Sequence, residues 1–263
     1  MAPPIDYSPT GMDTKLHQYA ELRGCAGWEA DDLPVTTQND TAAKLLDLSF
    51  RAAFTRSAPR YAALDGAKVA AAAVEADPSC SMAHITALAL RLIGASKAAP
   101  HVQPSLAAAT AACAAASSVW ERRHLHVLTV YASADDSTVG DLYNAIVEDY
   151  PFDTLALSLA FIRQHTSNPE PDSQGCFSER LLGNADNSPA RRAALLENTV
   201  RMLPEWTPSS GQPGDLYPFL LAEHAYSLGE CERYEESEVS VKSTISAKKS
   251  TIFCINPSFL VYS

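Results

Sequence analysis

The sequence is built from helix-length apolar stripes, most of which end at a proline, a glycine or a short polar turn. In residues 81–93, Ile85, Leu88, Ala89 and Leu92 follow the spacing of one helix face, i, i+3, i+4 and i+7. No window shows the apolar and polar alternation of a strand. The stripes predict nine helices, over residues 41–57, 62–76, 81–93, 105–119, 121–134, 139–150, 154–165, 189–203 and 216–228.

The composition favours closely packed helices. Alanine accounts for 43 of the 263 residues and aromatic residues for only 8%, a balance that argues against a β-sandwich or barrel. Apolar residues make up 46% and charged residues 19%, which excludes a disordered chain. Much of the alanine lies in residues 62–116, where small side chains would let neighbouring helices cross closely.

The predicted helices form pairs, and proline recurs in the turns between them. Pro78 and Pro151 are 73 positions apart, close to two units of about 34 to 37 residues. Pro204 follows Pro151 by 53 positions, which fits one unit plus an insertion at about residues 166–188. Because proline cannot continue a helix, it turns the chain back toward the next one. The spacing indicates a helix-turn-helix repeat.

These helix pairs resemble the tetratricopeptide repeat (TPR), a unit of about 34 residues with a proline in the connecting turn. Several stretches also resemble the N-terminal part of the tetratricopeptide repeat protein 38 family, across roughly residues 24–238. They are CAGW at 25–28, LPVTT at 33–37, and residues 73–94, 122–130, 147–157 and 203–208. The resemblance implies an all-α fold, a right-handed superhelix of degenerate TPR-like repeats (an α-solenoid). The insertion departs from the family pattern.

Three regions are expected on this basis. Residues 1–40 form a partly irregular N-terminal segment, residues 41–238 form the TPR-like repeat domain, and residues 239–263 form a tail outside the family pattern. The tail has three lysines, no acidic residue and no helical stripe. Since Glu-Val-Ser at 238–240 can be encoded by a consensus splice donor, the favoured interpretation is a retained intron that truncates a longer repeat protein. A genuine divergent tail is the alternative.

Charge and targeting features restrict the environment. The formal net charge of −11 argues against a nucleic-acid or anionic-membrane surface, which would need a positive field. The N-terminus has no apolar signal-peptide core, and no apolar run is long enough to span a bilayer. The six cysteines are scattered singly, as expected for free thiols. A cytoplasmic protein is predicted.

No motif supports a catalytic, cofactor or metal assignment. The sequence has no phosphate-binding glycine loop, no G-x-S-x-G elbow and no H-E-x-x-H pair. His124 and His126 are two positions apart, so they point to different helix faces. Asp31 and Asp32 are interpreted as turn-capping residues, and Trp28, Trp120 and Trp206 as side chains packed over helix ends. The chain is more readily a binding protein than an enzyme, and no cofactor is expected.

In helix-pair repeats the first helices line a concave surface. Polar residues predicted on that surface are His84, Arg91, Arg122, His126 and Arg163, together with Lys44 and Arg51. Arg91 and Arg163 could clamp a carboxylate. The predicted function is a non-catalytic scaffold that holds a peptide or partner protein on this face. The alternative is an enzyme or small-molecule-binding protein whose site residues lie partly in further C-terminal repeats.

Overall fold

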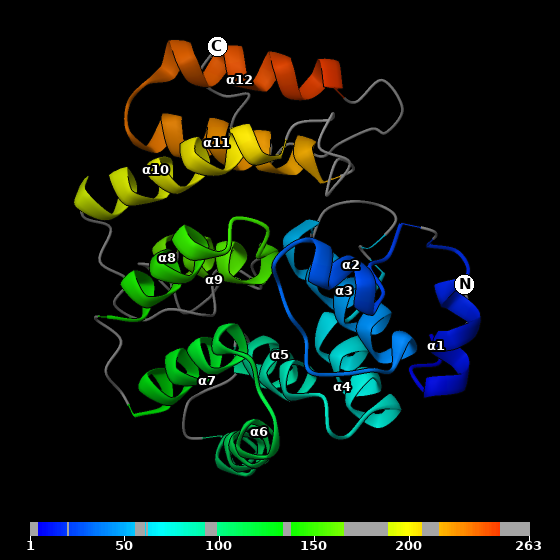
Figure 1. Ribbon diagram of the computed structural model, residues 1–263. Helices are drawn as coiled ribbons and strands as arrows, with labels where there is room; N and C mark the ends of the chain where they lie inside the picture. The colour runs from blue at the N-terminus through cyan, green and yellow to red at the C-terminus, as the bar shows by residue number, and fades with distance from the viewer. Residues whose placement is uncertain are drawn as a thin grey trace.

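The computed structural model describes residues 5–19, 21–55, 61, 63–92, 99–133, 138–165, 189–206 and 216–247. Within these ranges the chain forms twelve helices and no strand (Figure 1), which confirms the all-α prediction. The predicted insertion at residues 166–188 and the tail beyond Ala247 lie outside the described residues. No helix in the described part is long and apolar enough to cross a membrane.

The predicted helices are present, with most ends within a few residues of their predicted positions. These nine helices and a tenth, α12, form five consecutive pairs. The pairs are α3 (Asp40–Thr55) and α4 (Gly66–Ala76), α5 (Ser81–Leu92) and α6 (Val102–Ala115), α7 (Val119–Ala132) and α8 (Val139–Asp149), α9 (Thr154–His165) and α10 (Pro189–Glu205), and α11 (Tyr217–Glu230) and α12 (Tyr234–Ala247). Two further helices, α1 (Pro9–Leu16) and α2 (Cys25–Ala30), precede the pairs and were not predicted.

Capping explains several helix ends. Ser118 and Glu121 form a reciprocal capping box at the start of α7, so this helix begins two residues before its predicted start. Asp65 caps α4 through the backbone N–H groups of Ala67 and Lys68, which moves the start of this helix from residue 62 to Gly66. Pro78 and Pro151 lie in turns as predicted, whereas Pro204 lies inside the last turn of α10. The prediction that α10 ends before this proline was therefore wrong.

Most helices pack mainly against their neighbours in the sequence, from α3 to α12, an arrangement that fits an α-solenoid. The exceptions are α9 and α10, because α9 contacts α3, and α10 contacts α8, more than they contact each other. α3 departs from this rule, because it also contacts α5 and α9. Twelve of the sixteen residues of α3 are buried. Phe54, near the end of this helix, packs on Trp206 and Phe219, with ring centroids 5.9 and 6.2 Å apart. α3 is the central helix of the main core.

The N-terminal segment is more ordered than expected. α1 packs on α3 and α4, and its Met12 and Leu16 join a second core with Val69 and Ala73 of α4. At the other end, α12 continues nine residues past Glu238, a stretch whose sequence predicts no helix. Ser237 and Ser240 of α12 donate to backbone carbonyls of α11, at 2.7 and 3.2 Å. These bonds and the packing on α11 hold α12 in place without a strong apolar stripe.

Candidate functional site

The predicted binding residues do not form one cluster. Arg91 lies exposed at the end of α5, and Arg122 and His126 lie exposed one turn apart on α7. His84 is half-buried, and its Nε2 lies 2.9 Å from the Pro78 carbonyl. Among these four described side chains no hydrogen bond joins any two. Arg163 belongs to α9, but its side chain lies outside the described residues.

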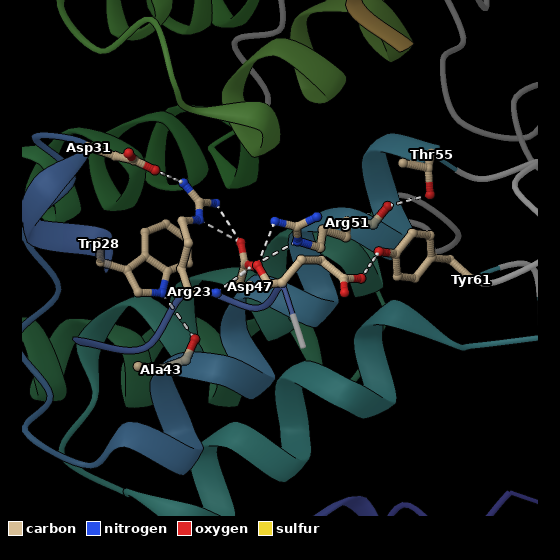
Figure 2. A network of polar contacts seen from close by, with 9 residues as sticks. Arg23, Trp28, Asp31, Ala43, Asp47, Arg51, Thr55 and Tyr61 are labelled. Carbon is tan, nitrogen blue, oxygen red and sulfur yellow. Dashed lines mark hydrogen bonds and ion pairs between the residues drawn. The ribbon is translucent and has the colours of Figure 1, made fainter. Parts of the chain in front are cut away.

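The polar residues that do come together are buried, and they surround Asp47 at the centre of α3 (Figure 2). Arg23 approaches Asp47 Oδ1 with Nε at 2.7 Å and Nη2 at 2.6 Å, and its backbone N–H donates to Oδ2 at 3.0 Å. Arg51, one turn further along α3, donates from Nε to Oδ2 at 2.7 Å. Asp31 accepts from Arg23 Nη1 at 3.0 Å. We call these four residues the ion network.

The ion network contradicts two expectations. Asp31 pairs with Arg23 and does not cap a turn with its carboxylate. Arg51, predicted on an open concave face, is buried. The i, i+4 spacing of Asp47 and Arg51 in an otherwise apolar part of α3 was the available signal, because two charges inside an apolar stretch need partners when the helix is buried. Nothing in the sequence marked Arg23 as the third member.

The pKa values of the two carboxyl groups in the ion network are shifted in opposite directions. Burial raises the pKa of Asp31 above its usual value, and the nearby Arg23 charge offsets only part of this. Burial would also raise the pKa of Asp47, but the charges of Arg23 and Arg51, together with the hydrogen bonds that both residues donate, hold this pKa below its usual value. Asp47 is therefore the firmly ionised partner of both arginines.

An aromatic cluster connects the ion network to α7. The Arg23 guanidinium lies over the Trp28 ring at 3.9 Å from its centroid. Trp28 packs edge-on against Phe50 at 5.1 Å and lies 5.8 Å from Trp120. Its indole N–H donates to the Ala43 carbonyl at 3.0 Å (Figure 2). Trp28 thus lies in the main core and not, as its position in the sequence had suggested, over a helix end.

A second buried polar cluster lies beyond Trp120. Asp153 Oδ2 is 2.6 Å from His124 Nε2 and accepts from Trp120 Nε1 at 2.7 Å, while Oδ1 accepts from the Ala156 backbone at 2.8 Å. Burial would raise the pKa of Asp153, but the His124 charge and these hydrogen bonds lower it. His124 and Asp153 are 1% and 0% exposed. The pair joins α7 to the start of α9 inside the core.

Glu121 links the loop after α2 to the third helix pair. Its Oε2 accepts from the Ser118 backbone at 2.7 Å. Its Oε1 accepts from the Thr36 backbone N–H and hydroxyl, at 3.2 and 2.9 Å. Further along the same loop, Thr37 donates to Asp77, and Asn39 Nδ2 donates to the Ala76 carbonyl at 2.9 Å. The loop is therefore fixed to α4 and α7 by polar side chains.

Metal-binding geometry is absent from the part of the chain that the structure describes, where no three His, Cys, Asp or Glu residues converge. No protein-family model and no solved structure matches the chain. The likeness to the tetratricopeptide repeat protein 38 family stays a prediction from the sequence.

Proposed function

We propose that this chain is a helical-repeat scaffold of the tetratricopeptide repeat protein 38 kind, which binds a segment of a partner protein and catalyses no reaction. The observation that supports this best is the succession of helix pairs, each packed on the next. Such stacks present long surfaces built from equivalent positions of successive helices.

The surface proposed for the partner carries exposed cationic and imidazole side chains of the first helices, Arg91 on α5 and Arg122 and His126 on α7. The Arg122 side chain is held by its bond from Nη1 to the Ser117 carbonyl at 2.6 Å. Arginine in a fixed position is suited to binding a carboxylate of a partner. Because the chain as a whole is acidic, such positions stand out from their surroundings.

The test is affinity capture with the full chain and a matched pair of variants, read by quantitative mass spectrometry. One variant combines R91A, R122A and H126A. The control combines K68A and K242A, exposed lysines on other helices. We expect a reproducible partner that the control retains and the triple variant loses at least tenfold. Equal capture by both variants would refute this surface, and the lack of any reproducible partner would refute the function.

A further inference from the structure

Residues 21–39 lie across several helix pairs and contribute only the short helix α2 (Figure 1). We call them the docked segment. Its residues contact α3 through Arg23 and Trp28, the end of α4 through Thr37 and Asn39, and the start of α7 through Thr36. The docked segment therefore contacts three different helices of the stack, as a bound peptide would.

The docked segment carries the residue types that dominate protein–protein interfaces. Trp28 is fully buried between Phe50 and Trp120, and Arg23 lies over its ring while contacting Asp47. Tryptophan and arginine anchors in enclosed pockets supply most of the binding energy at such interfaces. Leu33, which is also fully buried, adds a further apolar contact.

The ion network divides into two neutral pairs at the boundary of the docked segment. Arg23 and Asp31 belong to the segment and pair with each other at 3.0 Å. Asp47 and Arg51 both belong to α3 and pair at 2.7 Å. If the docked segment left the stack, each side would therefore keep a paired charge. An unpaired buried charge, which makes breaking an ion pair most costly, would not arise.

The remaining bonds are also replaceable. Glu121 would keep its bond to the Ser118 backbone, and separation would open the partners of Thr36, Thr37 and Asn39 to water, which can take their place. Three further bonds cross the boundary, from Arg51 Nη2 to the Glu21 carbonyl at 3.2 Å, from the Tyr61 hydroxyl to Glu21 Oε1 at 2.9 Å, and from the Cys25 backbone N–H to Asp40 Oδ1 at 3.1 Å. Water can replace these as well. Among the large side chains of the docked segment, Trp28, Leu33 and Arg23 are the most deeply buried, at 0%, 0% and 2% exposed, and we take them as its anchors.

We propose that the docked segment is an intramolecular ligand of the helix stack, and that a partner segment of the same chemistry binds by replacing it. Such a partner segment carries an arginine five positions before a tryptophan on a short helix, followed by an extended stretch with an apolar residue and a hydroxyl residue. Replacement by a partner segment rests on the proposed scaffold function, whereas docking of residues 21–39 within the chain does not depend on that function.

The test keeps the whole chain and cuts it after folding. Protease sites are inserted between His17 and Gln18 and between Gln38 and Asn39, four exposed residues. Cleavage separates residues 18–38, which include all of the docked segment except Asn39, from the rest of the chain. A fluorescent peptide of residues 18–38 is then added, and a W28A peptide serves as the matched control. Size exclusion measures exchange, and far-UV circular dichroism measures helix content.

We expect the wild-type peptide to replace the cut segment with helix content unchanged, and the W28A peptide to bind at least tenfold more weakly. The inference would be overturned if the cut segment left only when the rest of the chain lost helix content, or if both peptides bound equally well. If the inserted sites prevent folding, hydrogen exchange of the unaltered chain decides. The amides of Trp28 and Leu33 should then exchange at least tenfold faster than those in the middle of α5, and equal rates would refute docking.

The two proposals fail in different ways. Peptide exchange without any captured partner would keep the docking and remove the scaffold function. A captured partner without peptide exchange would keep the scaffold function and remove the docking proposal.

Discussion

Thr36 and Glu121 are 85 positions apart, and two hydrogen bonds join them, from the Thr36 backbone N–H and hydroxyl to one carboxylate oxygen. The other oxygen of Glu121 closes the capping box of α7. One buried carboxylate thus holds the loop after α2 and caps the first helix of the third pair.

The E121Q variant tests this double role. A glutamine side chain offers one acceptor oxygen and turns its NH₂ group toward a donor, either at Ser118 or at Thr36. An unsatisfied buried donor costs about 1 to 3 kcal/mol. We expect the urea midpoint to fall accordingly with an unchanged m-value. H126Q, an exposed change on the same helix, should stay within about 0.5 kcal/mol. Equal midpoints for the two variants would contradict this role.

The D47N variant tests the ion network. It leaves the buried Arg23 and Arg51 without their shared carboxylate, and removal of one partner from a buried pair costs about 3 to 5 kcal/mol. The matched control is K44Q, which breaks the exposed pair of Lys44 with Asp40 on the same helix and should cost less than about 1 kcal/mol. Chemical denaturation at neutral pH measures both. A loss below about 1 kcal/mol for D47N would show that the network is not fully enclosed.

Asp153 should make stability depend on pH in the acid range. Its folded pKa lies below its usual value of 3.8, so the folded state binds this proton more weakly than the unfolded state does. Its contribution is complete above the unfolded pKa and is lost as the pH falls through the folded pKa. We expect D153N to be less stable at neutral pH and to show a shallower loss of unfolding free energy between about pH 5 and 3. An unchanged slope would refute this contribution.

His224 should make the free energy of unfolding depend on pH closer to neutrality. Burial, followed by the charge of Arg233, lowers its pKa below 6.5, against a smaller opposing effect of Glu236. The unfolded state therefore takes up this proton first, and stability falls as the pH drops through 6.5 toward the folded value. H224Q should remove that part of the dependence between about pH 7.5 and 5. Since Thr199 Oγ1 lies 3.0 Å from His224 Nδ1, T199A serves as a control that keeps the titrating ring.

The helices of the pairs could be predicted because each one carries a local signal. The stripe in residues 139–150 and the proline at 151 are sufficient to place α8, and the structure ends this helix at Asp149. α1 and α2 are only eight and six residues long, so neither repeats an apolar stripe often enough to be recognised. They are stabilised by contacts with α3 and α4, which no local pattern records.

The buried polar clusters could not be predicted for a related reason. Arg23 meets Asp47 across 24 positions, and His124 meets Asp153 across 29. Without the packing of the helices, an arginine, a histidine or an aspartate in a soluble chain is more often exposed than buried. Exposed Arg122 and buried His124 differ only in the face of α7 on which they lie.

The contact between α3 and α9 has a consequence for how such a chain can change in length. In an open array a helix pair can be gained or lost, because each unit touches only its neighbours. Here the first pair meets the fourth directly. Adding or deleting one pair between them would move α9 away from α3 and uncover an apolar surface on both. Phe54 of α3 also packs on Phe219 of α11, so the number of pairs is fixed by geometry from α3 to α11.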